Sequence, residues 1–201
     1  MKRLERRDIV LLSLLYDTAA RAQEICDITV RSVRFGNPTK IVLVGKGGTS
    51  RLVPIMPKTA SILKQHISEN GLNSKESQKT PLFSSQSHEK MTRSCVTNIV
   101  NKYVGIAKEK HTDLFLDTYS PHSFRHSKAV HMLEAGNELI YIRDFLGHKS
   151  IKTTEIYAVV SQAIVTKALK ERKIPEATLN LNPIDTFETN PIPTFLRQRR
   201  S

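Results

Sequence analysis

The sequence predicts an α+β protein that is predominantly helical and contains a small three-stranded antiparallel sheet. Two observations support this class: apolar residues recur at helical spacing along much of the chain, and three short β-prone runs follow one another between residues 29 and 55. Turns that contain glycine separate these runs, as expected for consecutive strands that pair as hairpins. The 201 residues suffice for one domain with a buried core and a tail.

The first half of the chain is expected to contain a helix, the sheet and a second helix. Leucines at helical spacing predict an amphipathic helix over residues 6–15. The predicted strands span residues 29–35, 40–44 and 51–55. A helix over residues 57–69 follows, and the polar, Ser/Lys-rich residues 73–80 predict a surface loop.

The second half is expected to be helical. Its predicted helices span residues 92–108, 123–134, 138–146 and 161–172, and a further one carries Tyr157. Gly147, directly after the third of these helices, is a typical helix stop. From residue 174 onward the chain contains prolines and no clear periodicity, which predicts an extended or disordered tail. We therefore assign residues 1–173 to one domain and residues 174–201 to the tail.

The chain is strongly basic: 31 Lys and Arg residues against 19 Asp and Glu residues give a net charge of +12. This excess favours a polyanionic partner, although composition alone does not distinguish DNA from RNA or an anionic membrane. Cys26 and Cys95, the only cysteines, fit no metal-site spacing and are typical of a reduced cytoplasmic protein. No apolar stretch is long enough to span a bilayer.

Reactive chemistry is concentrated in two motifs, PHSFRH at residues 121–126 and LGH at residues 146–148, the second followed by Tyr157. A tyrosine can attack a phosphodiester while cationic and neutral donors hold the phosphate. Tyr157 must lose its proton during the attack or lie beside positive charge, because its free pKa is about 10. Arg125 can pair bidentately with the phosphate oxygens, and His122, one helical turn earlier, can address the same phosphate.

Three further residues complete this set. Arg21 lies in an otherwise apolar segment, TAARA, where an unpaired charge is costly, and Glu24 could orient it. Taken alone, the two would be interpreted as a plain surface ion pair. His148 lies at a helix C-terminus and can donate to the phosphate. Lys46, at a glycine-flanked hairpin tip, is long enough to act as a general acid on the leaving 5′ oxygen.

In their order and spacing, six residues resemble the active-site signature of the tyrosine recombinases, the phage integrase family: Arg21, Lys46, His122, Arg125, His148 and Tyr157. The resemblance covers about residues 6–172. The lysine hairpin alone has little specificity and the HxxRH block has more, whereas all six residues in order form a specific pattern. The fold of the family, a mostly helical catalytic domain with a small sheet, agrees with the elements expected here.

The resemblance implies a site-specific recombinase or integrase that acts on double-stranded DNA without metal, ATP or another cofactor. Tyr157 would form a 3′-phosphotyrosyl bond, and the freed 5′ hydroxyl of a partner strand would reverse the step. The family works as cyclic tetramers on two duplexes, which implies a homo-tetramer held through the segment after the tyrosine helix. Accessory DNA-bending proteins are further candidate partners, and the expected location is the nucleoid in the cytoplasm.

The chain departs from the family pattern in two places. Members usually have glycine and a larger apolar residue before the first arginine, where this chain has Ala19 and Ala20. We expect alanine to be tolerated unless the backbone there needs a positive φ angle. Most members also carry a helical DNA-binding domain ahead of the catalytic domain. We expect this domain to be absent, which fits either a fragment or a natural protein with a catalytic domain only.

Three other functions stay open. A non-catalytic DNA-binding regulatory relative is disfavoured by the intact set of six residues. A metal-dependent phosphodiesterase built on His122 and His126 lacks an HExxH pattern or a carboxylate cluster. A type IB topoisomerase-like enzyme would share the mechanism, but the short chain favours the recombinase.

Two site assignments also have plainer interpretations. Lys46 could be a solvated hairpin lysine, with Lys40 or Arg51 in its role, and Tyr157 could be an ordinary core aromatic residue. The position of Tyr157 nine residues after the LGH motif argues against the second interpretation.

Overall fold

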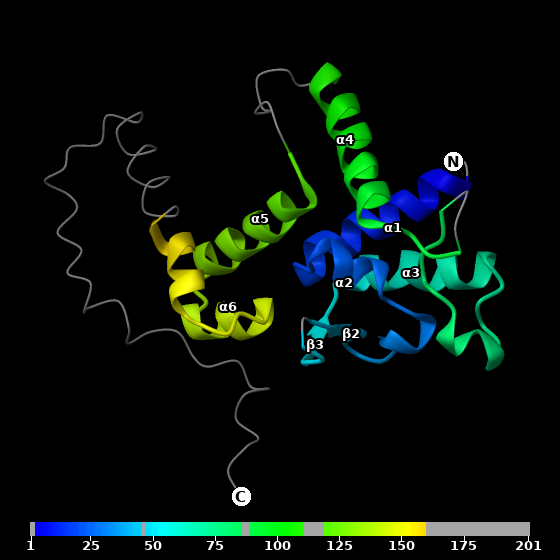
Figure 1. Ribbon diagram of the computed structural model, residues 1–201, viewed down its shortest axis with the longest axis horizontal. Coiled ribbons are helices and arrows are strands. Elements are labelled where there is room, and N and C mark those ends of the chain that lie inside the picture. Colours follow the sequence, from blue (N-terminus) through cyan, green and yellow to red (C-terminus); the bar gives the residue numbers. More distant parts are fainter. Residues whose placement is uncertain (1–2, 46, 86–88, 111–118, 160–201) are drawn as a thin grey trace, which may run out of the picture. The chain divides into compact units, whose positions relative to one another are not determined.

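The computed structural model describes residues 3–45, 47–85, 89–110 and 119–159, all within one compact unit, Met1–Gln162 (Figure 1). Three sequence-based expectations fall outside these ranges: Lys46, the helix at 161–172 and the tail at 174–201. The assignment of residues 1–173 to one domain therefore stays a prediction. No helix within the described ranges is long and apolar enough to cross a membrane.

Helix α1 (Arg3–Thr18) is the central helix of the framework and is longer than the predicted span of 6–15. Its buried side chains Leu11, Leu14 and Leu15 are fully shielded from solvent. It packs against α3 and α5, so it contacts both the first and the second half of the chain. The helix ends where the Thr18 hydroxyl donates to the Leu14 carbonyl at 2.6 Å.

The predicted three-stranded antiparallel sheet is confirmed, with the order β1-β2-β3. Its strands are β1 (Val33–Arg34), β2 (Lys40–Val44) and β3 (Ser50–Pro54). The first strand is shorter than predicted, because η1 (Val30–Ser32) takes up part of 29–35. The backbone N–H of Thr29 donates to the Ser32 hydroxyl at 3.2 Å, and such local bonds compete with strand pairing.

Helices precede and follow the sheet along the chain. The short α2 (Ala22–Cys26) precedes the sheet, and α3 (Pro57–Glu69) follows it over the predicted span. A proline opens α3, where its missing N–H leaves no intrahelical bond unmade. Asp17 at the end of α1 accepts a hydrogen bond from the Met56 backbone N–H at 2.9 Å, which fixes the start of α3. The predicted loop at 73–80 contains the short η2 (Glu76–Lys79).

The second half is helical, as predicted: α4 (Arg93–Lys110), α5 (Pro121–Glu134), α6 (Leu139–Leu146) and a helical segment at 152–159 that carries Tyr157. Helix α5 begins two residues before the expected 123, because Ser120 is its N-cap and Pro121 its first residue. Gly147 ends α6 in a left-handed conformation with φ 68°, which confirms the predicted stop.

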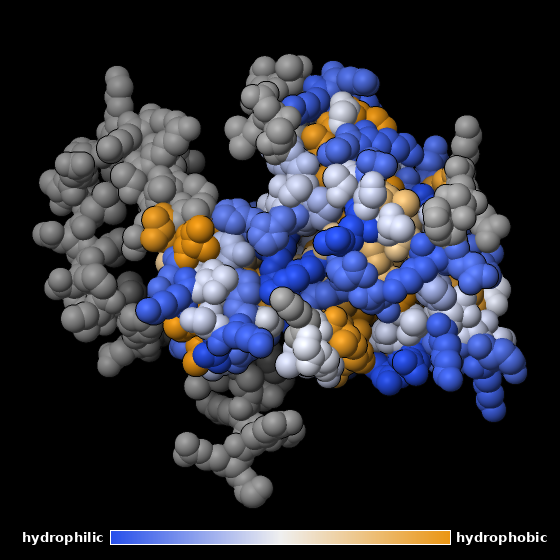
Figure 2. Space-filling view, in the orientation of Figure 1, coloured by the Kyte–Doolittle hydropathy of each residue, from blue (hydrophilic) through white to orange (hydrophobic). Residues whose placement is uncertain are grey.

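Two apolar clusters hold these elements together. The larger joins α1, α2, the sheet, α3 and α4. The smaller consists of Ala19, Ala129, Val130, Ile142, Leu146 and Tyr157. The face drawn in Figure 2 is mostly hydrophilic, with apolar side chains in separate patches, as expected when these clusters take up most of the large apolar residues.

Candidate active site

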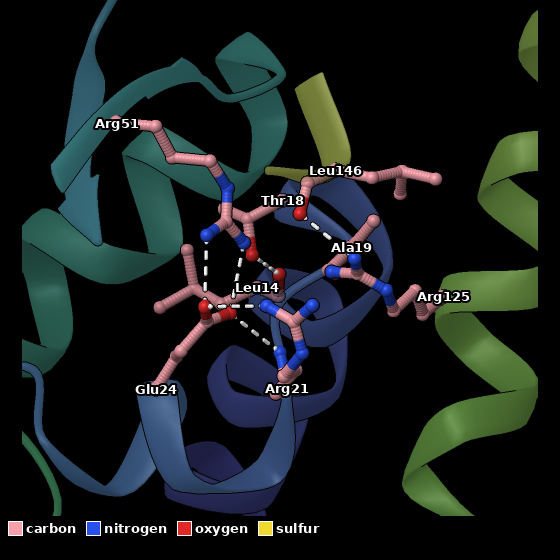
Figure 3. A network of polar contacts seen from close by, with 8 residues as sticks. All are labelled: Leu14, Thr18, Ala19, Arg21, Glu24, Arg51, Arg125 and Leu146. Carbon is pink, nitrogen blue, oxygen red and sulfur yellow. Dashed lines mark hydrogen bonds and ion pairs between the residues drawn. The ribbon is translucent and has the colours of Figure 1, made fainter. Parts of the chain in front are cut away.

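A group of arginines, histidines and a tyrosine gathers where the turn after α1, strand β3 and the ends of α5 and α6 meet. Figure 3 shows the arginines of this group, Arg21, Arg51 and Arg125, with their polar contacts. Five of the six predicted residues belong to this group: Arg21, His122, Arg125, His148 and Tyr157. Lys46, the sixth, lies outside the described residues, although its neighbours Gly45 and Gly47 are described.

Arg125 on α5 is the most deeply buried charge of the group, with 1% of its surface exposed. Its two terminal nitrogens donate to backbone carbonyls at 2.7 Å, Nη1 to Ala19 and Nη2 to Leu146. Burial, and then the charges of Arg21 and Arg51, lower the pKa of Arg125 to about 10, so it remains cationic at neutral pH. Its buried Nε has no hydrogen-bond partner within the described part of the chain.

Ala19 supplies one of these carbonyls from an unusual backbone conformation. Its φ angle is 48°, in the left-handed region, and its side chain is fully buried. The backbone therefore does need a positive φ angle, which was the condition under which alanine would not be neutral there. A left-handed residue other than glycine is disfavoured by about 1–2 kcal/mol. This strain accompanies a carbonyl that points at the Arg125 guanidinium (Figure 3).

Glu24 is buried and binds two arginines (Figure 3). As predicted, it orients Arg21, since it accepts the Arg21 backbone N–H at 2.8 Å and Nη1 at 3.2 Å. It also accepts both terminal nitrogens of Arg51 at 2.8 Å, one on each carboxylate oxygen. Burial alone would raise the pKa of Glu24, but the hydrogen bonds from Arg51 and Arg21 outweigh it and lower that pKa. The Glu24 carboxylate is therefore ionised, and because it is buried and shared with Arg51, its contact with Arg21 is not a plain surface ion pair.

The two histidines lie close to these cations. Burial, and then the charge of Arg125, lower the pKa of His122 and bring that of His148 to about 4. Both rings are therefore neutral at pH 7. The Nδ1 atom of His148 lies 3.0 Å from the hydroxyl of the buried Thr154. The backbone N–H of His148 donates to the Arg143 carbonyl in the turn that ends α6.

Tyr157 packs against two histidine rings and is 3% exposed. The His126 ring centroid lies 5.1 Å from that of Tyr157, and the nearly parallel His148 ring lies 6.5 Å away. This environment suits a nucleophile held beside cationic and neutral donors, and it also suits an ordinary core aromatic residue. Within the described ranges, no three His, Cys, Asp or Glu side chains are grouped so that they could hold a metal ion.

A protein-family model described as the phage integrase family matches residues 1–163. The chain belongs to the phage integrase family. This integrase-family chain is 35% identical, over 173 residues, to a protein named "Tyrosine recombinase" from Pseudothermotoga lettingae. The match covers 83% of this chain and 55% of the relative. It is 31% identical over 175 residues to tyrosine recombinase XerC from Pelobacter propionicus, with 85% of this chain and 54% of the relative covered.

Among solved structures, the integrase-family chain resembles XerH site-specific recombinase bound to a palindromic difH substrate in a post-cleavage complex. The TM-score is 0.70 at 22% sequence identity, and the match covers 87% of this chain and 48% of XerH. This likeness confirms the predicted fold. The chain spans about half the length of the relatives it matches.

Arg51 is the site residue whose role the sequence analysis missed. It was considered only as a substitute for Lys46, whereas the structure pairs it with Glu24. A signal was present, because the period of two in a strand places Arg51 on the same face as Val53 and Ile55, which are buried. A charged residue at such a position needs a buried partner of opposite charge.

Proposed function

We propose that this chain is the catalytic part of a site-specific DNA recombinase that cuts and rejoins double-stranded DNA through a 3′-phosphotyrosyl bond at Tyr157, without metal or ATP. The observation that carries this proposal is the grouping of Arg21, Arg125, His122 and His148 beside Tyr157. A tyrosine is a competent nucleophile for a phosphate, and the surrounding donors suit a transition state in which negative charge accumulates.

The charge balance of the site supports an anionic substrate. Among the described residues, Arg21 and Arg51 pair with a single carboxylate, Glu24, and Arg125 pairs with carbonyls only. The excess positive charge is suited to one phosphodiester. Arg21 is available to bind it because 45% of its side chain is exposed, whereas Arg125 is 1% exposed and would have to be uncovered before its unpartnered Nε could donate.

The neutral histidines fit the role of phosphate donors. A neutral imidazole carries one N–H, and which nitrogen carries it depends on the partner of the other nitrogen. A Thr154 hydroxyl that donates to Nδ1 of His148 would leave the proton on Nε2, from which it can be donated to a phosphate oxygen. Lys46 would protonate the leaving 5′ oxygen, a role that rests on the family resemblance.

Tyr157 has to move before it reacts. With 3% of its surface exposed, Tyr157 lies almost entirely inside the domain. The reaction we propose therefore includes a displacement of the helical segment at 152–159. DNA binding would favour the displaced state if the phosphate contacts form only there.

The proposal extends to the assembly on DNA. We propose a homo-tetramer on two duplexes, with residues 161–201 contacting the neighbouring copy, and DNA-bending accessory proteins as further partners. The net charge of +12 supports binding to the phosphate backbone, and the nucleoid is the corresponding location.

The test uses nicked duplexes of random sequence, mixed with the protein in chelator and denatured in detergent. We expect protein-linked DNA with the wild type and none with Tyr157→Phe, while Tyr141→Phe, at a tyrosine that is 49% exposed on α6, should behave as the wild type. A folded, DNA-binding wild type that forms no adduct would favour the regulatory alternative. An adduct that Tyr157→Phe still forms would assign the nucleophile elsewhere.

A further inference from the structure

Arg51 occupies a position that no phosphate contact requires. It lies on β3, opposite Leu43 in the strand register and on the inward face of the sheet, where 13% of its side chain is exposed. Both of its terminal nitrogens bind Glu24, and its buried Nε has no hydrogen-bond partner in the described part of the chain. Burying a guanidinium at this position costs desolvation free energy, so a role for Arg51 is to be sought in the groups it contacts.

The first contact of Arg51 is with Glu24. Without Arg51, this carboxylate would bind Arg21 more tightly. Arg51 approaches both carboxylate oxygens at 2.8 Å, whereas the side chain of Arg21 makes one longer contact, 3.2 Å, to Oε1. The exposed fractions differ accordingly, 13% for Arg51 and 45% for Arg21. Because Arg51 neutralises the buried carboxylate, the charge of Arg21 stays available to a ligand.

The second contact is with the turn that carries His148. A β-carbon added at Gly147 would lie 3.1 Å from Nη1 of Arg51 and 3.3 Å from its Cδ. The neighbours of Gly147 in the chain are His148 and Leu146, and the Leu146 carbonyl accepts a hydrogen bond from Arg125. Arg51 therefore packs directly against the backbone that places two of the phosphate-site groups.

We propose that Arg51 is a positioning residue for DNA cleavage: it occupies Glu24, which leaves Arg21 free to bind the phosphate, and it supports the Gly147 turn that presents His148. This role rests on the proposed function. Arg51 acts through Glu24 and Gly147 and forms no bond with the reacting phosphate.

The test separates the cleavage step from DNA binding. In single-turnover cleavage at saturating DNA, Arg51→Met should lower the rate by about 100-fold, the size expected for a misplaced catalytic group. The cleavage rate of Arg51→Lys should fall between those of Arg51→Met and the wild type, because an ammonium does not match both carboxylate oxygens of Glu24. The matched control is Arg34→Met, an exposed arginine of the same sheet, which should leave the saturated rate unchanged.

A double variant distinguishes positioning from general support of the fold. In Arg51→Met, the unpaired Glu24 should capture Arg21, whereas Arg51→Met/Glu24→Gln removes that charge and should recover part of the cleavage rate. The double variant also keeps the test valid if Arg51→Met fails to fold, since it leaves no buried carboxylate unpaired; cleavage still well below the wild-type rate would then support positioning.

A readout without DNA makes the two proposals separable. Exchange of the Arg21 Nε proton, measured by NMR, should be slower in Arg51→Met than in the wild type. If the wild type forms no adduct and this exchange still slows, the proposed function fails, while the contact by which Arg51 occupies Glu24 and leaves Arg21 free is supported. If Arg51→Met cleaves at the wild-type rate, or if Arg21 exchange is unchanged, the positioning role is overturned while the recombinase proposal is unaffected.

Discussion

The two apolar clusters of this domain differ in size and in the chemistry they support. The larger cluster joins α1, α2, the sheet, α3 and α4, and Glu24, Arg21 and Arg51 are attached to it. The smaller one holds a few side chains of α5, α6 and the segment at 152–159, and it contains Tyr157 itself. The Glu24 network that includes Arg21 thus lies beside the extensively packed region. The proposed nucleophile lies in the sparsely packed one, on the same side as α5 and α6, which carry or precede His122, Arg125 and His148.

This difference has a physical consequence. The free energy of a local opening rises with the apolar surface that it exposes, so a small cluster opens more readily than a large one. The proposed phosphate donor Arg21 benefits from its place beside the larger cluster, because preorganised donors need no rearrangement in the transition state. A buried tyrosine that must reach DNA benefits from the opposite property.

The largest expected effect is that of Arg125, whose two carbonyl partners, Ala19 and Leu146, both belong to the smaller cluster. Arg125→Met leaves the carbonyls of Ala19 and Leu146 without their donor, and each unsatisfied buried group costs about 1–3 kcal/mol. We expect adduct formation to fall by about 1000-fold or more and the urea midpoint to drop. Arg125→Lys should also fail, because one ammonium does not reach both carbonyls. Normal cleavage by a folded Arg125→Met protein would contradict the role of this residue.

The comparison of the clusters is tested directly by one truncation in each. Leu14 and Ile142 are both fully buried, one in each cluster. Leu14→Ala should lower the free energy of global unfolding by about 2–5 kcal/mol. Ile142→Ala should have a smaller effect on global unfolding but should speed amide hydrogen exchange in α6 and at 152–159. Equal exchange profiles in the two variants would show that the domain opens as one unit.

Acid should destabilise the site region through its histidines. The pKa of His148 is about 4 in the folded protein and about 6.5 when unfolded, so the unfolded chain binds the proton more readily between these values. Stability should therefore fall as the pH decreases from about 6.5 towards 4, and the lowered pKa of His122 acts in the same direction. Urea unfolding across this range should show a flatter pH dependence for His148→Asn. An unchanged slope would place the acid sensitivity elsewhere.

The smallest effect concerns the two alanines before Arg21, one in each cluster. Ala19→Gly relieves a positive φ angle and loses a buried methyl group, two changes of about 1 kcal/mol that oppose each other. Ala20→Gly loses the methyl group and gains no such relief, so it should destabilise by about 1 kcal/mol or more. Chemical denaturation of both variants measures the difference, and equal losses would contradict the strain at Ala19.

Much of the fold follows from local patterns. The leucine spacing, the Pro57 start and the Gly147 stop are properties of neighbouring residues, and the helices they predict are present with small shifts at their ends. The first strand was overestimated because Val30 and Val33 favour strands, whereas the Thr29 and Ser32 side chains bond to the local backbone.

The site was predictable to the extent that its residues form a sequence motif. Its five described members gather in one place, but the pairing of Arg51 with Glu24, 27 residues earlier, depends on where the fold places β3 relative to α2. The left-handed conformation of Ala19 likewise accompanies a hydrogen bond to Arg125, a residue that the local sequence does not contain. Contacts between distant elements leave no periodic signal, so sequence patterns identified the chemical groups but not what holds them.

The two hydrogen bonds from Arg125 to backbone carbonyls also make its position depend on the completion of folding. Its guanidinium spans 106 residues of sequence to Ala19 and 21 residues to Leu146, so it is held only when three separate stretches of chain have docked. A newly made or damaged chain in which one stretch is out of place has no correctly held Arg125. Under the proposed function, such a chain would not cut DNA until its folding is complete.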